Sequence, residues 1–333
     1  MRSLYAAAIA VALLLCVVPL AQGHEDPGEQ IAALSAQIAQ HPDDAALYMR
    51  RADLRRIRRE WPEALADLQA VNGLDPVPAT ADLLAARVLL EADNPHAALA
   101  AIDRFVARDG SSAAGHLLRA RILVHLGSSA DAAAEFTRGI DLARAAGTRA
   151  QPDDYLDRAR ALSSGGAMSF DEAIRGLDEG TNDLGAAIAL QLYAIDLEVE
   201  RHHWDAALAR LAALQARATR KESWIERRAD ILLLAGRRPE ARQCYLEAQA
   251  AVQKLPERLR TTRAITDMAQ RIQFRLSSLD ASAGTHGALA GEDGAVASGQ
   301  GALAGDAHDA LAGRQARQAG DDVARPPQRA ASR

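Results

Sequence analysis

Histidine is the residue type with the widest chemical range in this sequence, but its spacing forms no catalytic or metal-binding motif. The nine histidines include no pair at i, i+4, the spacing with which a zinc-protease helix presents two imidazoles on one face. His116 and His125 are nine positions apart, so on one helix they point in opposite directions. We therefore predict that the histidines face solvent or lie in turns, and that the chain holds no metal and no cofactor.

Nucleophile motifs are missing as well. The sequence contains neither a Gly-x-Ser-x-Gly elbow nor a Gly-x4-Gly-Lys-Ser/Thr phosphate loop. Cys244, beside Tyr245, is expected to be a small buried apolar residue rather than a nucleophile. We assign no catalytic residue and predict a protein that is not an enzyme. A site assembled from distant groove residues stays open as an alternative, because sequence spacing does not reveal such sites.

Composition and charge exclude further classes. The 333 residues are 49% hydrophobic but only 4% aromatic, and an apolar content dominated by Ala and Leu favours helices over strands. The formal net charge of -5 leaves no basic excess for nucleic acid. The scarcity of aromatic residues disfavours a carbohydrate-binding module. The arginines at positions 50–59 are predicted to form a solvated charged face.

Small residues recur with a period of 34 through the middle of the chain. Two positions in each period, usually twelve residues apart, hold alanine. The fourth unit is longer, and in the fifth Ile195 replaces the first alanine. The small residues at these positions are Ala52, Ala64, Ala86, Ala98, Ala120, Ala132, Ala159, Ala173, Ala207, Ala229 and Ala241.

This pattern resembles the tetratricopeptide repeat family. Its most complete copy runs from Ala45 to Pro76, with Tyr48, Ala52, Ala64 and Leu68 at the family's characteristic positions. The family has small residues where the two helices of a pair approach closely, and we expect the same here. The resemblance covers about residues 30–279. It implies an all-α fold, a right-handed α-solenoid of about six helix pairs with flanking capping helices, and a binding role rather than a reaction.

The ends of the chain differ from this array. Arg2 precedes a short apolar run that stops at Pro19, and small residues follow at positions 21 and 23, which is the order of a secretory signal peptide. We expect cleavage after Gly23 and a periplasmic or secreted protein without a membrane span. The predicted organisation is a signal peptide (1–23), a lead-in and capping helix (24–41), the repeat array (42–255), a capping helix (256–279) and a disordered Gly/Ala-rich tail (280–333).

Groove residues follow from the repeat register. In the family, positions 2, 5, 9 and 12 of each first helix line the concave face, and here position 9 includes Arg87, Arg121 and Arg160 beside leucines at positions 5 and 6. One interpretation is that they bind a partner segment that is apolar with acidic side chains. The other is that the leucines pack within the array and the arginines pair there. The candidate groove residues are Arg50, Leu83, Leu84, Arg87, Leu117, Leu118, Arg121, Leu156, Arg160 and Tyr193.

The sequence thus predicts a protein–protein interaction scaffold or adaptor of the bacterial cell envelope, whose partner is another protein. The alternatives are an accessory subunit of an envelope enzyme or assembly complex, an enzyme with an unrecognised site, and a carbohydrate-binding module. Neither the partner's identity nor the oligomeric state follows from the residues.

Overall fold

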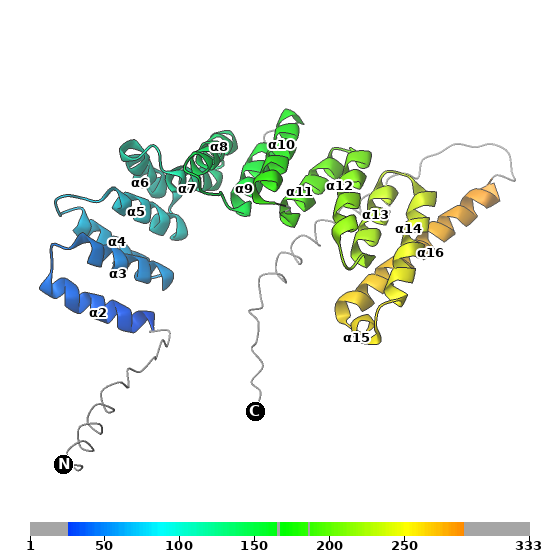
Figure 1. The fold of residues 1–333 in the computed structure, drawn as a ribbon, viewed down its shortest axis with the longest axis horizontal. Coiled ribbons are helices and arrows are strands. Elements are labelled where there is room, and N and C mark those ends of the chain that lie inside the picture. Colours follow the sequence, from blue (N-terminus) through cyan, green and yellow to red (C-terminus); the bar gives the residue numbers. More distant parts are fainter. Residues whose placement is uncertain (1–25, 165–166, 186, 290–333) are drawn as a thin grey trace, which may run out of the picture. The chain divides into compact units, whose positions relative to one another are not determined.

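The computed structural model describes residues 26–164, 167–185 and 187–289 (Figure 1). All regular elements in these ranges are helices, which confirms the predicted all-α fold. The chain divides into two compact units, with the boundary between Ala150 and Gln151. Each unit is a solenoid of helix pairs and is described by itself below.

The first unit begins with a single helix, α2 (Pro27–Gln40), which packs against the first of three antiparallel pairs. Successive pairs stack in chain order, and the first helix of each pair also contacts the first helix of the next (Figure 1). The pairs are α3 (Ala45–Ile57) with α4 (Trp61–Val71), α5 (Ala79–Glu91) with α6 (Pro95–Arg108), and α7 (Ala113–His125) with α8 (Ser129–Ala145).

The second unit has three pairs followed by a short helix and a long one. The pairs are α9 (Pro152–Ser163) with α10 (Ala167–Leu184), α11 (Ile188–Glu200) with α12 (Trp204–Arg217), and α13 (Glu222–Leu234) with α14 (Arg238–Gln253). After α15 (Glu257–Arg260), α16 (Arg263–Leu289) packs back against α14. It continues past residue 279, so its last residues belong to the segment predicted as a tail. The predicted signal peptide and residues 290–333 lie outside the described residues.

Local sequence signals set the helix boundaries. The side chains of Asp44, Asn94 and Ser112 accept hydrogen bonds from backbone N–H groups in the first turns of α3, α6 and α7, which satisfies donors that have no partner within the helix. Gly127 and Gly236 follow the ends of α7 and α13 with φ of +77° and +75°. Glycine adopts this left-handed conformation without steric strain, so it allows the chain to turn sharply into the next helix.

The repeated small residues lie inside the pairs. Ala52 and Ala64 share one apolar cluster, and Ala229 and Ala241 share another. A larger side chain at these positions would have to push the two helices apart. All of the set are at most 1% exposed: Ala52, Ala64, Ala86, Ala98, Ala120, Ala132, Ala159, Ala173, Ala207, Ala229 and Ala241.

Candidate interaction surface

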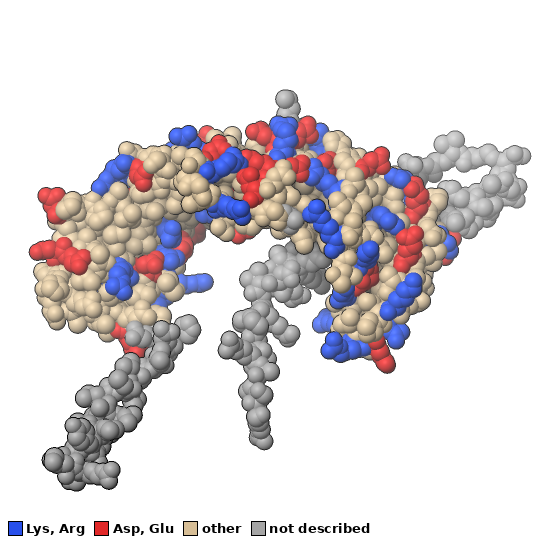
Figure 2. Space-filling view, in the orientation of Figure 1, with Lys and Arg blue, Asp and Glu red and all other residues tan. Residues whose placement is uncertain are grey.

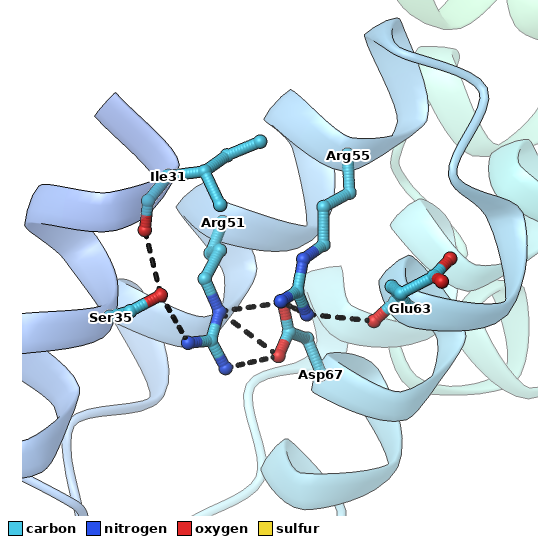
Figure 3. A network of polar contacts seen from close by, with 6 residues as sticks. All are labelled: Ile31, Ser35, Arg51, Arg55, Glu63 and Asp67. Carbon is cyan, nitrogen blue, oxygen red and sulfur yellow. Dashed lines mark hydrogen bonds and ion pairs between the residues drawn. The ribbon is translucent and has the colours of Figure 1, made fainter. Parts of the chain in front are cut away.

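A charged network joins α2, α3 and α4 (Figure 3). Arg51 of α3 donates from Nε and Nη2 to the two carboxylate oxygens of Asp67 in α4, at 3.0 and 2.6 Å, and from Nη1 to Ser35 Oγ in α2 at 2.8 Å. Arg55 donates to the same carboxylate at 2.8 Å. Asp67 is only 3% exposed, so these two cations compensate a buried charge. The prediction of a solvated face is therefore wrong for Arg51 and Arg55.

The same position of the helix pair carries an arginine in three other pairs, as Arg119, Arg158 and Arg228. Arg158 of α9 donates to Glu179 of α10 at 2.6 Å. Arg119 of α7 donates to Glu135 of α8 at 2.6 Å and to Asp103 of α6 at 2.7 Å. Arg228 of α13 directs Nε at Cys244 Sγ of α14, 3.1 Å away. For Arg51, Arg119 and Arg228, the residue contacted on the second helix stands sixteen positions after the arginine. A bridge of this kind thus recurs in α3/α4, α7/α8 and α13/α14.

Sequence reasoning missed this bridge, although a signal for it exists. Each of the three bridging arginines directly precedes the first small residue of its repeat. Its partner on the second helix stands three positions after the second small residue of the repeat. This partner is Asp67, Glu135 or Cys244. Cys244 is buried as expected, and burial raises the pKa of its thiol, although the hydrogen bond from Arg228 acts in the opposite direction.

His116 contradicts the prediction of solvent-facing histidines. Its side chain is buried on α7, with Nδ1 2.7 Å from a carboxylate oxygen of Glu135 and Nε2 3.1 Å from the carbonyl oxygen of Gly110. Arg119 holds the other oxygen of the same carboxylate. The ring therefore links α7 to α8 and to the turn that precedes α7, so its role in the structure is to position these elements.

The predicted groove arginines have different surroundings. Arg87 on α5 and Arg50 on α3 are exposed, and neither guanidinium has an ion-pair or hydrogen-bond partner within the part of the chain that the structure describes. Arg121 on α7 is half-buried. Arg160 lies in the second unit, where it donates to Asp157 at 2.8 Å and sits 5.7 Å from the ring centroid of the half-buried Tyr193. Arg160 thus follows the interpretation in which arginines pair within the array.

The predicted groove leucines do not form an open apolar row. Leu118 is 6% exposed, within the apolar cluster of α5 and α6, and Leu156 is 9% exposed. Half-buried Leu83 packs against the same cluster as Leu118, and half-buried Leu84 packs against the cluster of α3 and α4. Leu118 and Leu156 thus follow the interpretation in which the leucines pack within the array.

Leu117 is half-buried and lies against α8. Its Cγ is 2.7 Å from the position that a Cβ would take at Gly139, so glycine at that position lets the leucine approach the helix backbone. Of the predicted groove residues in the first unit, Arg50 and Arg87 are thus the exposed ones. In the first unit, the predicted groove therefore offers a partner the charged side chains of Arg50 and Arg87.

Within residues 26–164, 167–185 and 187–289, no three His, Cys, Asp or Glu side chains are grouped so that they could hold a metal ion. None of the helices in the same ranges is both long enough and apolar enough to cross a membrane. On the face shown in Figure 2, acidic and basic side chains are interspersed over most of the surface.

Residues 83–154 match the family model of the tetratricopeptide repeat. This segment, which runs from α5 to the start of α9, therefore carries the tetratricopeptide repeat. The solved structures to which it is similar include a tetratricopeptide repeat protein from Parabacteroides merdae, at 15% identity over 74% of this chain and 93% of the other, with a TM-score of 0.45. The C-terminal part of a repeat-containing protein from Cytophaga hutchinsonii matches at 12% identity over 76% and 90%, with a TM-score of 0.47.

Another similar structure is that of YrrB, a tetratricopeptide-repeat protein with an unusual peptide-binding site. It is 13% identical over 67% of this chain and 93% of that chain, with a TM-score of 0.39. No curated protein matches the sequence significantly.

Proposed function

We propose that this protein, which carries the tetratricopeptide repeat, is a scaffold that holds an acidic segment of a partner protein against the first unit, with Arg87 as the main anchor. Proteins of this repeat family generally serve as protein–protein interaction scaffolds. The observation that carries the assignment to a site is the exposed guanidinium of Arg87, which has no partner among the described residues. By contrast, three arginines on neighbouring helices are ion-paired, namely Arg56, Arg104 and Arg119. A free guanidinium offers a planar fork of donors that fits a carboxylate.

The surroundings of Arg87 hold their own charges in pairs. Arg56 of α3 donates to Asp53 at 2.8 Å and reaches Glu91 of α5 at 2.7 Å. Partial burial opposes the charge on Arg56, but the hydrogen bonds and charges of Asp53 and Glu91 keep its pKa above the ordinary value. These acidic side chains are therefore engaged, and they leave Arg87 to an external carboxylate. Arg50, one helix pair earlier and equally unpartnered among the described residues, would extend the contact.

The partner in this proposal differs from the one that the sequence indicated. Because Leu118 is buried and Leu83 and Leu84 are packed in core clusters, the contact needs no apolar partner surface. The contact depends on charge complementarity between arginine and acidic side chains of the partner. Such contacts weaken as the salt concentration rises. An acidic, extended partner segment is the simplest occupant.

The test uses a photoreactive amino acid at Thr80, an exposed residue at position 2 of α5, which shares the predicted concave face with Arg87. We expect a crosslink in cells that Arg87→Glu abolishes and that Arg87→Lys weakens. A photoreactive residue in place of the exposed Ala134 of α8 serves as the control position. A crosslink at Thr80 that survives Arg87→Glu, or capture at Ala134 alone, would remove the proposed site.

We further propose that the protein acts in the bacterial cell envelope. The support is the order of residues 1–23, with a basic start, a short apolar run and small residues before a cleavage point. N-terminal sequencing of the protein isolated from its own cells tests this directly. A mature chain that starts at His24 is expected, and a cytosolic chain that keeps Arg2 would contradict the proposal.

A further inference from the structure

One edge of the second unit concentrates exposed cations. Because α13 runs antiparallel to both α12 and α14, the α12–α13 turn and the segment from α14 to α16 lie at the same edge. Ile225 and Leu255, from near these two turns, pack against the same apolar cluster. We call this region the basic edge. Its exposed cations are Arg217, Arg220, Lys221, Lys254, Arg258, Arg260 and Arg263.

The charge of the basic edge is large for so few residues. Residues 217–222 and 254–263 hold seven Lys and Arg against two Asp and Glu, a net charge of +5, in a chain whose formal net charge is -5. Both lysines of the whole sequence, Lys221 and Lys254, lie here. Figure 2 shows blue side chains gathered at the part of the second unit where Figure 1 places α15.

These cations have little internal compensation. Arg220 pairs with Glu222, and Arg263 lies 3.8 Å from Asp267. For the side chains of the other five, the described part of the chain provides no ion-pair or hydrogen-bond partner: Arg217, Lys221, Lys254, Arg258 and Arg260. A concentration of like charge without partners opposes folding through self-repulsion. An external anion would relieve that repulsion.

The opposite edge of the same unit gives the contrast. There the second helices begin, and Arg237 donates to Glu240 at 2.6 Å and to Asp205 at 2.9 Å. The hydrogen bond with Glu240 also raises the pKa of Arg237 and lowers the pKa of Glu240. This cation is thus paired with acidic side chains of the chain itself, whereas most cations of the basic edge are not.

We propose that the basic edge binds the surface of an anionic phospholipid membrane peripherally. Its cations project from turns at the outside of the unit, where they can reach a broad surface at once. Half-buried Leu255 and Leu259 lie among them and add apolar contact at the headgroup level. Clustered lysine and arginine side chains are attracted to anionic lipids, and each contributes separately to the affinity.

This inference does not depend on the proposed function. The basic edge lies in the second unit, whereas Arg87 and Arg50 lie in the first. Loss of membrane binding and loss of the partner crosslink are therefore separate outcomes.

The experiment measures sedimentation of the purified full chain with vesicles of phosphatidylglycerol and, in parallel, of phosphatidylcholine. Binding to phosphatidylglycerol that weakens with salt is expected, without binding to phosphatidylcholine. The triple variant Lys254→Glu, Arg258→Glu, Arg260→Glu should bind at least about a hundredfold more weakly, because about fivefold is lost with each cation alone. These side chains are exposed and have no partner among the described residues, so the variant should keep the circular dichroism of the wild type.

A matched control makes the result specific. The variant Arg138→Glu, Arg149→Glu, Arg175→Glu changes the net charge equally at three exposed arginines elsewhere, and it should bind within about twofold of the wild type. Equal losses in both variants would overturn the proposal, because net charge alone would then explain the binding. Absence of binding to phosphatidylglycerol at low salt would overturn it too. Tighter binding to duplex DNA at the same salt would assign the edge to nucleic acid.

Discussion

The pairs α3/α4 and α5/α6 build the same contact with opposite chemistry. In α3/α4 the position before the first repeat alanine is Arg51, bonded to buried Asp67. In α5/α6 the equivalent residues are Ala85 and Ala101, also sixteen positions apart. Ala101 is 1% exposed, and Ala85 packs against two apolar clusters. A helix pair of this chain therefore forms with either a charged bridge or two methyl groups at this position.

The two kinds of pair differ in the contacts that the residue at this position makes outside its own pair. Arg51 extends beyond its pair to Ser35 of α2, and Arg119 extends similarly to Asp103 of α6. The methyl group of Ala85 cannot extend in this way. In its pair, Arg104 and Arg108 instead form ion pairs with Asp82, at 2.9 and 3.6 Å. A buried ion pair contributes little net stability over well-packed apolar residues. We infer that the bridging arginines fix how one pair stacks on the preceding helix.

The largest expected effect comes from placing half of the bridge in the apolar pair. Ala101→Asp puts a carboxylate at a 1% exposed site opposite Ala85, without an arginine, and should lower the free energy of unfolding by more than about 3 kcal/mol. Urea unfolding followed by circular dichroism measures it, and hydrogen exchange of α5 and α6 assigns it to this pair. Adding Ala85→Arg should restore part of the loss. A single variant as stable as the wild type would show that the two pairs are not equivalent.

Removing half of the natural bridge should have a somewhat smaller effect. Asp67→Ala leaves Arg51 and Arg55 without their shared carboxylate, and a loss of about 2 to 3 kcal/mol is expected because both guanidinium groups are largely buried. The triple variant with Arg51→Ala and Arg55→Ala should be more stable than Asp67→Ala alone, since it removes the uncompensated charge. If the triple variant were the less stable one, the bridge would be a net source of stability.

This comparison also shows what the sequence could reveal. Ala52 and its counterparts were predictable because close helix approach requires a small side chain, whatever surrounds the pair. The sequence did not reveal that the Arg51 side chain points inward, because Arg51 lies in a run of arginines that is typical of a solvated face. Leu118 was assigned to a groove from helical phase alone, and phase does not show that the preceding pair covers that face. Contacts between pairs depend on the stacking, which the repeat pattern does not specify.

The contact with the preceding helix should have a moderate effect by itself. Ser35→Ala removes the oxygen that accepts from Arg51 at 2.8 Å and leaves that donor without its partner. A loss of about 1 kcal/mol is expected. It should appear as faster hydrogen exchange in α2 more than in α4, because only the stacking contact is changed. The exposed Ala36 on the same helix provides a neutral control, Ala36→Ser. Equal acceleration in α4 would argue that Ser35 supports the Arg51–Asp67 pair rather than the stacking.

The smallest effect is expected at Arg228, which faces a thiol at the bridge position and pairs with Glu247 of α14 at 2.6 Å. Cys244 occupies the acid position opposite Arg228, and burial raises the pKa of its thiol, so the sulfur stays neutral at pH 7. Cys244→Asp would supply the carboxylate that Arg51 and Arg119 already have, and stability should change by less than about 1 kcal/mol because desolvation and ion pairing nearly cancel. The same replacement at Ala101 should be severely destabilising. The two aspartates would thus occupy one repeat position and differ in whether an arginine faces them. If urea unfolding gave equal losses for both, burial of the carboxylate alone would decide the outcome, and the arginine would have no part in setting it.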